Sequence, residues 1–172
     1  MQSEEGKVRP VSASAVSLYE VVLAIHVMAV VVAFGVTFAY PIMFAVAGRH
    51  DPRSLPLMHR AEYTIERYLV NPGLLLVVLA GIFLASDGHY WNEFFVQWGL
   101  AAAIVIGALI GSVMIPTAKR AEEIAARDIA AAGHADPEMS DEYRALVRRL
   151  SSVGTLLSGL VLVTILIMAI KP

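Results

Sequence analysis

The chain has 172 residues, of which 58% are hydrophobic and 16% are charged, and its formal net charge is -2. Its mean hydropathy of +0.67 excludes an intrinsically disordered chain, because so much apolar surface requires burial or lipid. The lack of excess basic residues argues against a nucleic-acid partner. Without cysteine there is no disulfide, thiolate metal site or iron–sulfur cluster.

Four uncharged apolar segments follow a polar tail that covers residues 1–20. Each is long enough to cross the hydrocarbon core of a bilayer as a helix, the form that satisfies every backbone polar group in lipid. The segments are residues 21–47, 69–86, 94–118 and 150–170. We therefore predict an all-α integral membrane protein. Residues 21–170 would form a single domain, an antiparallel up-down bundle of four transmembrane helices. Tyr40-Pro41 predicts a kink or an early helix stop near the inner end of the first span.

The loops on one side of the membrane are also predicted to be helical. Apolar residues recur at helical spacing over residues 55–68, and residues 117–132 are rich in alanine. Gly133 and Asp136-Pro137 are expected to end the second of these helices, and Ser140 to cap the next. We expect that next helix to continue without a break into the fourth span.

Basic residues are distributed unevenly among the loops, which predicts the orientation. Ten of the 13 lysine and arginine residues lie in the first and third loops, and the second loop has none. Because such residues concentrate on the cytoplasmic side, both termini are predicted to lie outside the cell membrane. An aromatic belt supports this, since it gathers at the predicted outer interface: Tyr19, Tyr90, Trp91, Phe94, Phe95 and Trp98.

Small residues are spaced for close helix packing. The third span carries Gly99, Ala103, Gly107 and Gly111 at intervals of four residues, and the first span carries Ala29, Ala33 and Thr37. Such faces let helix backbones approach one another in lipid. The same pattern fits packing within the bundle, a homo-oligomer, or a place in a larger membrane complex.

His26 is the single ionisable side chain within the four predicted spans. Counted from Val21, it lies roughly 8 Å below the outer edge of the membrane. The small residues of the first span continue on its face, which predicts that it points into the bundle. At its depth we expect residues 79–81, residues 100–102, Thr164 and Ile165.

Two interpretations of His26 are open. It can be a neutral core residue that is hydrogen bonded to Thr164 or to a backbone carbonyl. Alternatively, its small neighbours leave room for a planar cofactor, of which haem b is the candidate, and His26 is an axial ligand. His89, in the outer loop, is a candidate second ligand. His50, His59 and His134 are predicted to lie on the opposite side of the membrane. The sequence predicts no other metal site and assigns no catalytic residue.

Three short motifs resemble a family of predicted integral membrane proteins that is known as a domain of unknown function. They are Ala24-Ile25-His26-Val27, Glu66-Arg67-Tyr68-Leu69-Val70-Asn71-Pro72 and Val153-Gly154-Thr155-Leu156-Leu157. The resemblance covers most of the chain from about residue 18 to residue 172. More distantly, the chain is similar to HemJ-type protoporphyrinogen oxidases and to the copper-resistance protein D group.

The resemblance to the HemJ-type enzymes implies haem binding through His26, which corresponds to their first-helix histidine. These enzymes also carry a lysine early in the third span, where this chain has Gln97-Trp98-Gly99, and an Asn-Glu pair where it has Ser151-Ser152. The resemblance therefore implies haem binding more directly than oxidase activity.

Three function classes follow from the sequence. The first is an accessory or structural membrane subunit, and the second is a haem-binding redox protein. The third, a small-solute transporter, is least favoured because the sequence shows no inverted repeat and no charge within a span.

Overall fold

The computed structural model describes residues 16–171 of the chain, so most of the predicted tail, residues 1–20, lies outside the described residues. Four long helices account for nearly all of the described part. The first comprises α1 (Leu18–Gly35), the 3-10 turn η1 (Val36–Phe38) and α2 (Tyr40–His50). The second comprises η2 (Pro52–Ser54), α3 (Leu55–Ile65), the π-helical turn η3 (Glu66–Val70) and α4 (Asn71–Asp87).

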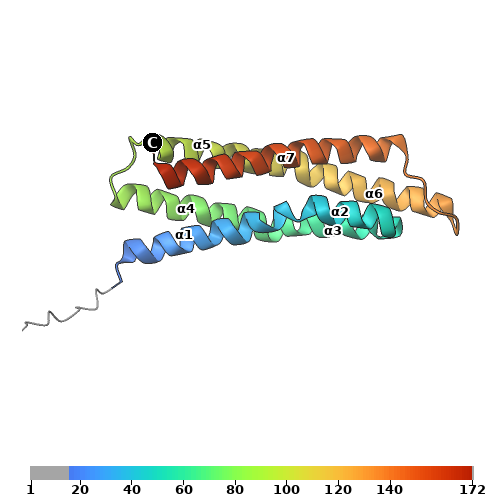
Figure 1. The fold of residues 1–172 in the computed structure, drawn as a ribbon, viewed down its shortest axis with the longest axis horizontal. Helices are drawn as coiled ribbons and strands as arrows, with labels where there is room; N and C mark the ends of the chain where they lie inside the picture. The colour runs from blue at the N-terminus through green and yellow to red at the C-terminus, as the bar shows by residue number, and fades with distance from the viewer. Residues whose placement is uncertain (1–15, 172) are drawn as a thin grey trace, which may run out of the picture.

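The third and fourth helices complete the bundle. The third comprises α5 (Phe94–Leu109), the π-helical turn η4 (Ile110–Met114) and α6 (Ile115–Ala132), and the fourth is α7 (Asp141–Ile170). Successive helices run in alternating directions along the long axis (Figure 1), in keeping with the predicted up-down order. Leu18, the loop 88–93 and Lys171 therefore share one end, called here the terminal end. The opposite end is called the arginine-rich end.

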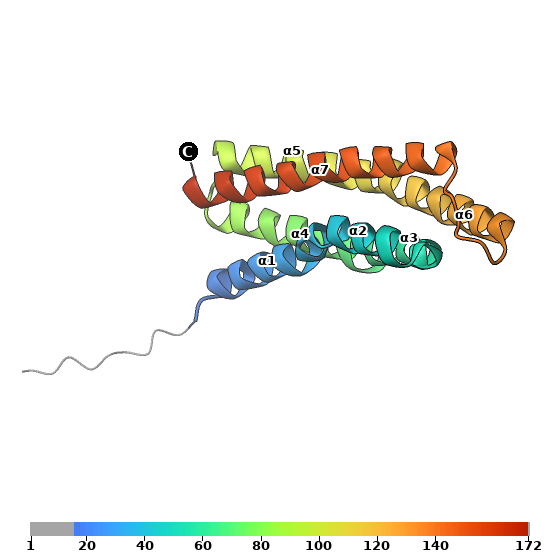
Figure 2. The same ribbon diagram turned by 45° about the vertical axis from the view of Figure 1, so that its right-hand side comes forward.

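The helices form two layers (Figures 1 and 2). One layer contains α1 to α4, in which α1 packs along α4, and the other contains α5, α6 and α7. The layers meet where α3 packs on α6 and α4 on α5. The first helix contacts α7 at η1, near the middle of the bundle. Toward the terminal end α1 diverges from α7, as both views show.

The outer surface of the bundle is apolar, as a membrane protein requires. Many large apolar side chains are exposed, among them Val31 at 64%, Ile104 at 65% and Leu156 at 60%. A water-soluble domain would not expose so much contiguous apolar surface. All four helices are long and apolar enough to cross a membrane. They are also longer than the ~20 residues that span a bilayer, which fits the predicted helical extensions.

Prolines accompany the breaks within the long helices. The α-helix gives way to the 3-10 turn η1 before Pro41, which stands at the start of α2, so the helix is interrupted close to the position where a kink or an early helix stop was predicted. Each π-helical turn ends shortly before a proline, Pro72 or Pro116. A proline cannot donate the N–H that a regular helix needs at its position, so the register of the preceding turn shifts. The sequence analysis did not predict these π-helical turns.

The α6–α7 hairpin matches its local sequence signals. The α6 helix ends at Ala132 and is followed by Gly133 with a φ of 59°, which glycine adopts without strain. The Ser140 hydroxyl accepts a hydrogen bond from the Tyr143 backbone N–H and caps α7. As predicted, α7 continues without a break from Asp141 into the apolar fourth segment.

Three glycines lie against a neighbouring helix, as close packing of small residues predicts, whereas two other glycines do not. A Cβ atom added to Gly73 would lie 2.5 Å from Cβ of Ala33, which locates the closest approach of α1 and α4. Added at Gly107 it would lie 3.2 Å from Leu74, and at Gly99 it would collide with Met168. Gly111 and Gly159, by contrast, have open space around them.

Candidate functional site

His26 points from α1 toward α4, as its face on the first span predicts. Its Nδ1 atom lies 3.0 Å from the backbone carbonyl oxygen of Val77. Gly81, one turn further along α4, makes room for the ring, because an added Cβ would come within 3.4 Å of the His26 Cε1 atom. Of the two predicted partners, the structure thus has the backbone carbonyl. The Thr164 hydroxyl instead lies 3.1 Å from the Trp98 indole nitrogen, from which it accepts a hydrogen bond.

The hydrogen bond to Val77 fixes the tautomer of His26. A carbonyl oxygen can only accept, so Nδ1 carries the proton and donates it, and the Nε2 lone pair remains available in the neutral ring. No hydrogen-bond partner of Nε2 is found among the described residues. An imidazole whose Nδ1–H is held by a backbone carbonyl is the usual form of a metal-ligating histidine, because the carbonyl orients the ring and raises its basicity.

His26 lines a cavity of about 420 Å³ at the terminal end of the bundle, where α1 diverges from α7. This volume lies in the range of roughly 300–1,000 Å³ that small-molecule and cofactor sites occupy. Helices α1, α4, α5 and α7 all contribute to the walls, which are predominantly apolar. The predicted neighbours of His26 that line the same cavity are Gly81, Leu100, Thr164 and Ile165.

Aromatic residues and one cation line the part of the cavity near the chain termini. Tyr19, Tyr90 and Trp91 belong to the predicted aromatic belt, and all three line the cavity. Lys171, at the end of α7, also lines it, and its ammonium lies 5.7 Å from the ring centre of Tyr90 and 5.6 Å from that of Phe95. The apolar interior of the cavity therefore ends in a rim, where the Lys171 ammonium can bind an anionic group.

The described residues offer no ready site for a bare metal ion. Among them, no group of three or more histidine, aspartate and glutamate side chains is arranged to hold one. A single histidine such as His26 can act as a ligand only to a metal that is already held by another group.

The comparison with protein families matches nearly the whole chain. A family model described as a predicted integral membrane protein, DUF2269, covers residues 20–172. The chain belongs to the DUF2269 family. This family membership, together with the four apolar helices, confirms the prediction of an integral membrane protein. Neither a curated protein nor a solved structure matches the chain.

The second predicted ligand, His89, does not share the cavity of this DUF2269 protein. It is exposed in the loop after α4, with a φ of 59°, and its Nδ1 atom lies 3.1 Å from the backbone carbonyl oxygen of Asp87. It is not among the residues that line the cavity. His26 is therefore the histidine that the structure places in the cavity.

A buried polar cluster near the arginine-rich end was missed by the sequence analysis. We call it the His59 cluster. Its members come from three of the long helices: Tyr40, His59, Glu62, Glu66 and Tyr143. His59, Glu62 and Glu66 are spaced i, i+3 and i+7, which places them on one helix face. This spacing was the sequence feature from which the buried cluster could have been predicted.

Proposed function

We propose that this DUF2269 protein is a haem-binding membrane redox protein, with His26 as an axial ligand to a haem b in the cavity at the terminal end. The observation that carries the proposal is the state of the His26 ring. Its Nδ1 is anchored on the Val77 carbonyl oxygen, while its Nε2 is left without a partner at an apolar cavity. A neutral imidazole held in this way is suited to coordinate iron.

The walls of the cavity fit a flat apolar ring system. Small and apolar residues make up most of the lining, among them Gly81, which makes room for the His26 ring, and Ala103. The lining residues include no carboxylate, so an apolar macrocycle would meet no buried anion. Lys171 and Tyr19, which also line the cavity, would supply the charge and hydroxyl that haem propionates need.

A bound haem would supply one-electron transfer. The protein's own contribution would be to hold and orient the ring and to exclude water, because the cavity offers no carboxylate that could act as an acid or base. This favours electron transfer or tetrapyrrole binding over the oxidase chemistry of the HemJ-type enzymes, in agreement with the residues at which the chain departs from them.

The test is the absorption spectrum of the protein purified in detergent from cells supplied with haem precursors. We expect a Soret band in the wild type, and we expect His26→Ala to lose or shift it while circular dichroism shows that the helices persist. His89→Ala is the matched control, because His89 lies outside the cavity, and it should keep the wild-type spectrum. A wild type without haem under full supply would contradict the proposal. So would an unchanged spectrum in His26→Ala.

A second candidate function is that of an accessory subunit in a homo-oligomer or a larger membrane complex. The observation that favours it is the exposure of Gly159 on α7 and Gly111 on the third helix, both with open space around them. Exposed small residues allow another helix to approach closely in lipid. Native mass spectrometry in detergent would test it: Gly159→Leu should dissociate an oligomer. A monomeric wild type that co-purifies with no other subunit would rule it out.

A further inference from the structure

The His59 cluster joins the two layers of the bundle through hydrogen bonds. The ring of His59, which is 1% exposed, lies between α3 and α7. Its Nδ1 atom lies 3.2 Å from Oε2 of Glu62, and its Nε2 atom lies 3.0 Å from the hydroxyl oxygen of Tyr143. Phe44 of α2 stacks on the same ring, with centroids 4.6 Å apart. Both ring nitrogens are thus engaged, in contrast to His26.

Two polar atoms in the cluster have no hydrogen-bond partner. They are Oε2 of Glu66, in a residue that is 3% exposed, and the hydroxyl of Tyr40, in a residue that is 8% exposed. Glu62 stands four residues before Glu66, so the two carboxylates lie on the same face of the helix. Two acidic side chains are therefore buried together beside unpartnered atoms.

The groups that face the cluster come from every element packed around it, and the nearby cations are engaged elsewhere. Tyr40 belongs to α2, His59 and Glu62 to α3, Glu66 to η3 and Tyr143 to α7, and Thr117 is a buried polar residue of α6, the helix that packs against α3. Arg60 pairs with Glu122, at 2.7 Å. Lys119 lies over the Tyr63 ring and Arg67 over the exposed Tyr68 ring. The two buried carboxylates therefore have His59 as their one possible cationic partner within the cluster.

This arrangement is unfavourable unless it takes up positive charge. Each buried and unpaired carboxylate carries a desolvation penalty of several kcal/mol, and buried polar atoms nearly always have a partner. The Glu62 carboxylate has a hydrogen-bonding partner, because its Oε2 atom lies 3.2 Å from Nδ1 of His59. The second carboxylate, Glu66, has no such partner and needs a proton or another cation of its own.

We propose that the His59 cluster is a proton-binding site, in which Glu66 is held as the neutral acid. A bound water would supply the hydrogen-bond partner that Oε2 of Glu66 and the Tyr40 hydroxyl both lack. A metal ion is not the expected occupant, because the described histidine, aspartate and glutamate residues form no group with ligand geometry. The proposal does not depend on haem binding at His26.

The site lies where the release of a proton would lower the stability of the bundle. Glu66 opens the π-helical turn η3, and such turns are frequent at functional sites. Loss of its proton would place an uncompensated charge between the layers, near the His59–Tyr143 contact that joins α3 to α7. High pH should therefore loosen this end of the bundle.

Infrared spectroscopy tests the proton directly. At pH 7 we expect the wild type to show the carbonyl stretch of a protonated carboxylic acid that exchanges slowly with deuterated water. Glu66→Gln, which mimics the neutral acid, should lack this band. Absence of the band in the wild type would overturn the proposal, as would its persistence in Glu66→Gln.

Thermal unfolding between about pH 5 and about pH 9, where buried acids and histidines titrate, gives a second measurement. The wild-type melting temperature should fall by about 5 °C or more toward the alkaline end, and Glu66→Gln should lose most of this fall. The control is Glu123→Gln, an exposed carboxylate on α6, which should keep the wild-type profile. An equal alkaline fall in Glu66→Gln would contradict the assignment. Saturable stabilisation of the wild type by sodium, potassium or magnesium ions would show a metal cation in place of the proton.

Discussion

Two histidines in this chain differ in how their ring nitrogens are used, and the difference decides what each can do. His26 donates from Nδ1 to a backbone carbonyl and keeps Nε2 free at an apolar cavity. His59 uses both nitrogens, toward Glu62 and Tyr143, and is almost fully buried. A free lone pair suits a ligand to iron, whereas a ring that is hydrogen bonded at both nitrogens is held in place and has no lone pair left for a metal.

The sequence indicated the first of these residues more readily than the second. His26 is conspicuous because no other histidine and no acidic or basic side chain lies in the predicted spans. Counting along helices was enough to place Gly81 and Thr164 beside its cavity. The partner of His59, Tyr143, is 84 residues away along the chain. That contact depends on how the second and fourth helices pack, which helical spacing alone does not specify.

Gly107→Leu should destabilise the bundle. Its Cβ alone would lie 3.2 Å from Leu74 on the neighbouring helix α4, and the rest of a leucine side chain would push α4 and α5 apart. Overpacking of this kind costs about 1–3 kcal/mol. Thermal unfolding in detergent measures the loss.

Gly111→Leu is the matched control for this prediction. It lies one helical turn further along the same stripe, but nothing surrounds the position where its Cβ would be. We expect little change there, or a slight gain, because leucine is the better helix former. Equal losses in the two variants would show that the difference in packing does not govern stability.

The elements themselves were well predicted where their signals are local. The Ser140 cap, the stop at Gly133 and the uninterrupted fourth helix each depend on a few adjacent residues, and all are confirmed. The π-helical turns before Pro72 and Pro116 were not predicted. A proline can end, kink or widen a helix, and packing against neighbouring helices selects among these outcomes.

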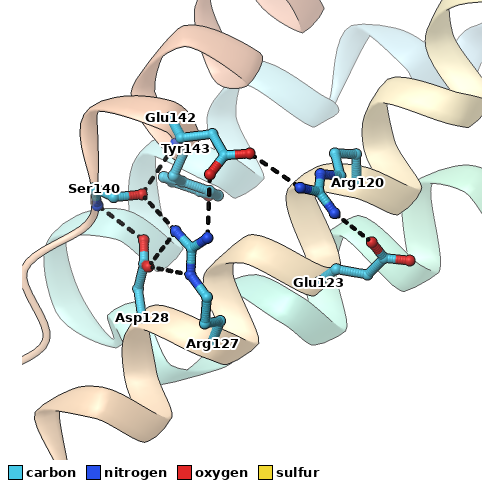
Figure 3. A network of polar contacts seen from close by, with 7 residues as sticks. All are labelled: Arg120, Glu123, Arg127, Asp128, Ser140, Glu142 and Tyr143. Carbon is cyan, nitrogen blue, oxygen red and sulfur yellow. Dashed lines mark hydrogen bonds and ion pairs between the residues drawn. The ribbon is translucent and has the colours of Figure 1, made fainter.

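A network of polar contacts holds the α6–α7 hairpin together (Figure 3). Arg127 of α6 pairs with Glu142 in the first turn of α7 and also with Asp128, while Asp128 accepts the backbone N–H of Ser140 at 2.8 Å. Hydrogen bonds from Ser140, with a further contribution from Arg127, hold the pKa of Asp128 below its ordinary value of 3.8. The carboxylate therefore stabilises the hairpin in its ionised form.

Asp128→Ala should destabilise the hairpin at neutral pH, because the Ser140 N–H loses its acceptor at a cost of about 1 kcal/mol. A lowered pKa contributes stability that is present above the ordinary value and is lost as the pH falls through the folded-state value. The difference from the wild type should therefore shrink below about pH 4. Hydrogen exchange of the α6–α7 amides measures it. Asp136→Ala, an exposed loop variant, is the control, and a pH-independent difference for Asp128→Ala would contradict the prediction.

At the scale of the whole molecule, the two candidate sites lie toward opposite ends of one bundle. The cavity at His26 is at the terminal end, near Leu18 and Lys171, and the His59 cluster is toward the arginine-rich end. Between them lies a tightly packed apolar layer, which includes Ala33, Phe34 and Leu74. Such a layer keeps the two sites chemically separate, so variants at one should leave the other unchanged.

The orientation of this bundle in the membrane gives the last prediction. The helical extensions carry ten of the 13 basic residues, and the loop 88–93 at the terminal end carries none. Because basic loops stay in the cytoplasm during insertion, we expect the His59 cluster toward the cytoplasm, and the termini and the His26 cavity toward the outer face of the cell membrane.

Reporter fusions placed after Gly88 and after Gly133 test this orientation. The first should be active only with a reporter that works outside the cytoplasm, and the second only with a cytoplasmic reporter. A fusion after Lys171 is the internal control, since the antiparallel order requires it to match Gly88. Cytoplasmic activity at Gly88 together with external activity at Gly133 would show that the bundle is inserted the other way round. Haem at His26 would then be open to the cytoplasm, and the proton site would face outward.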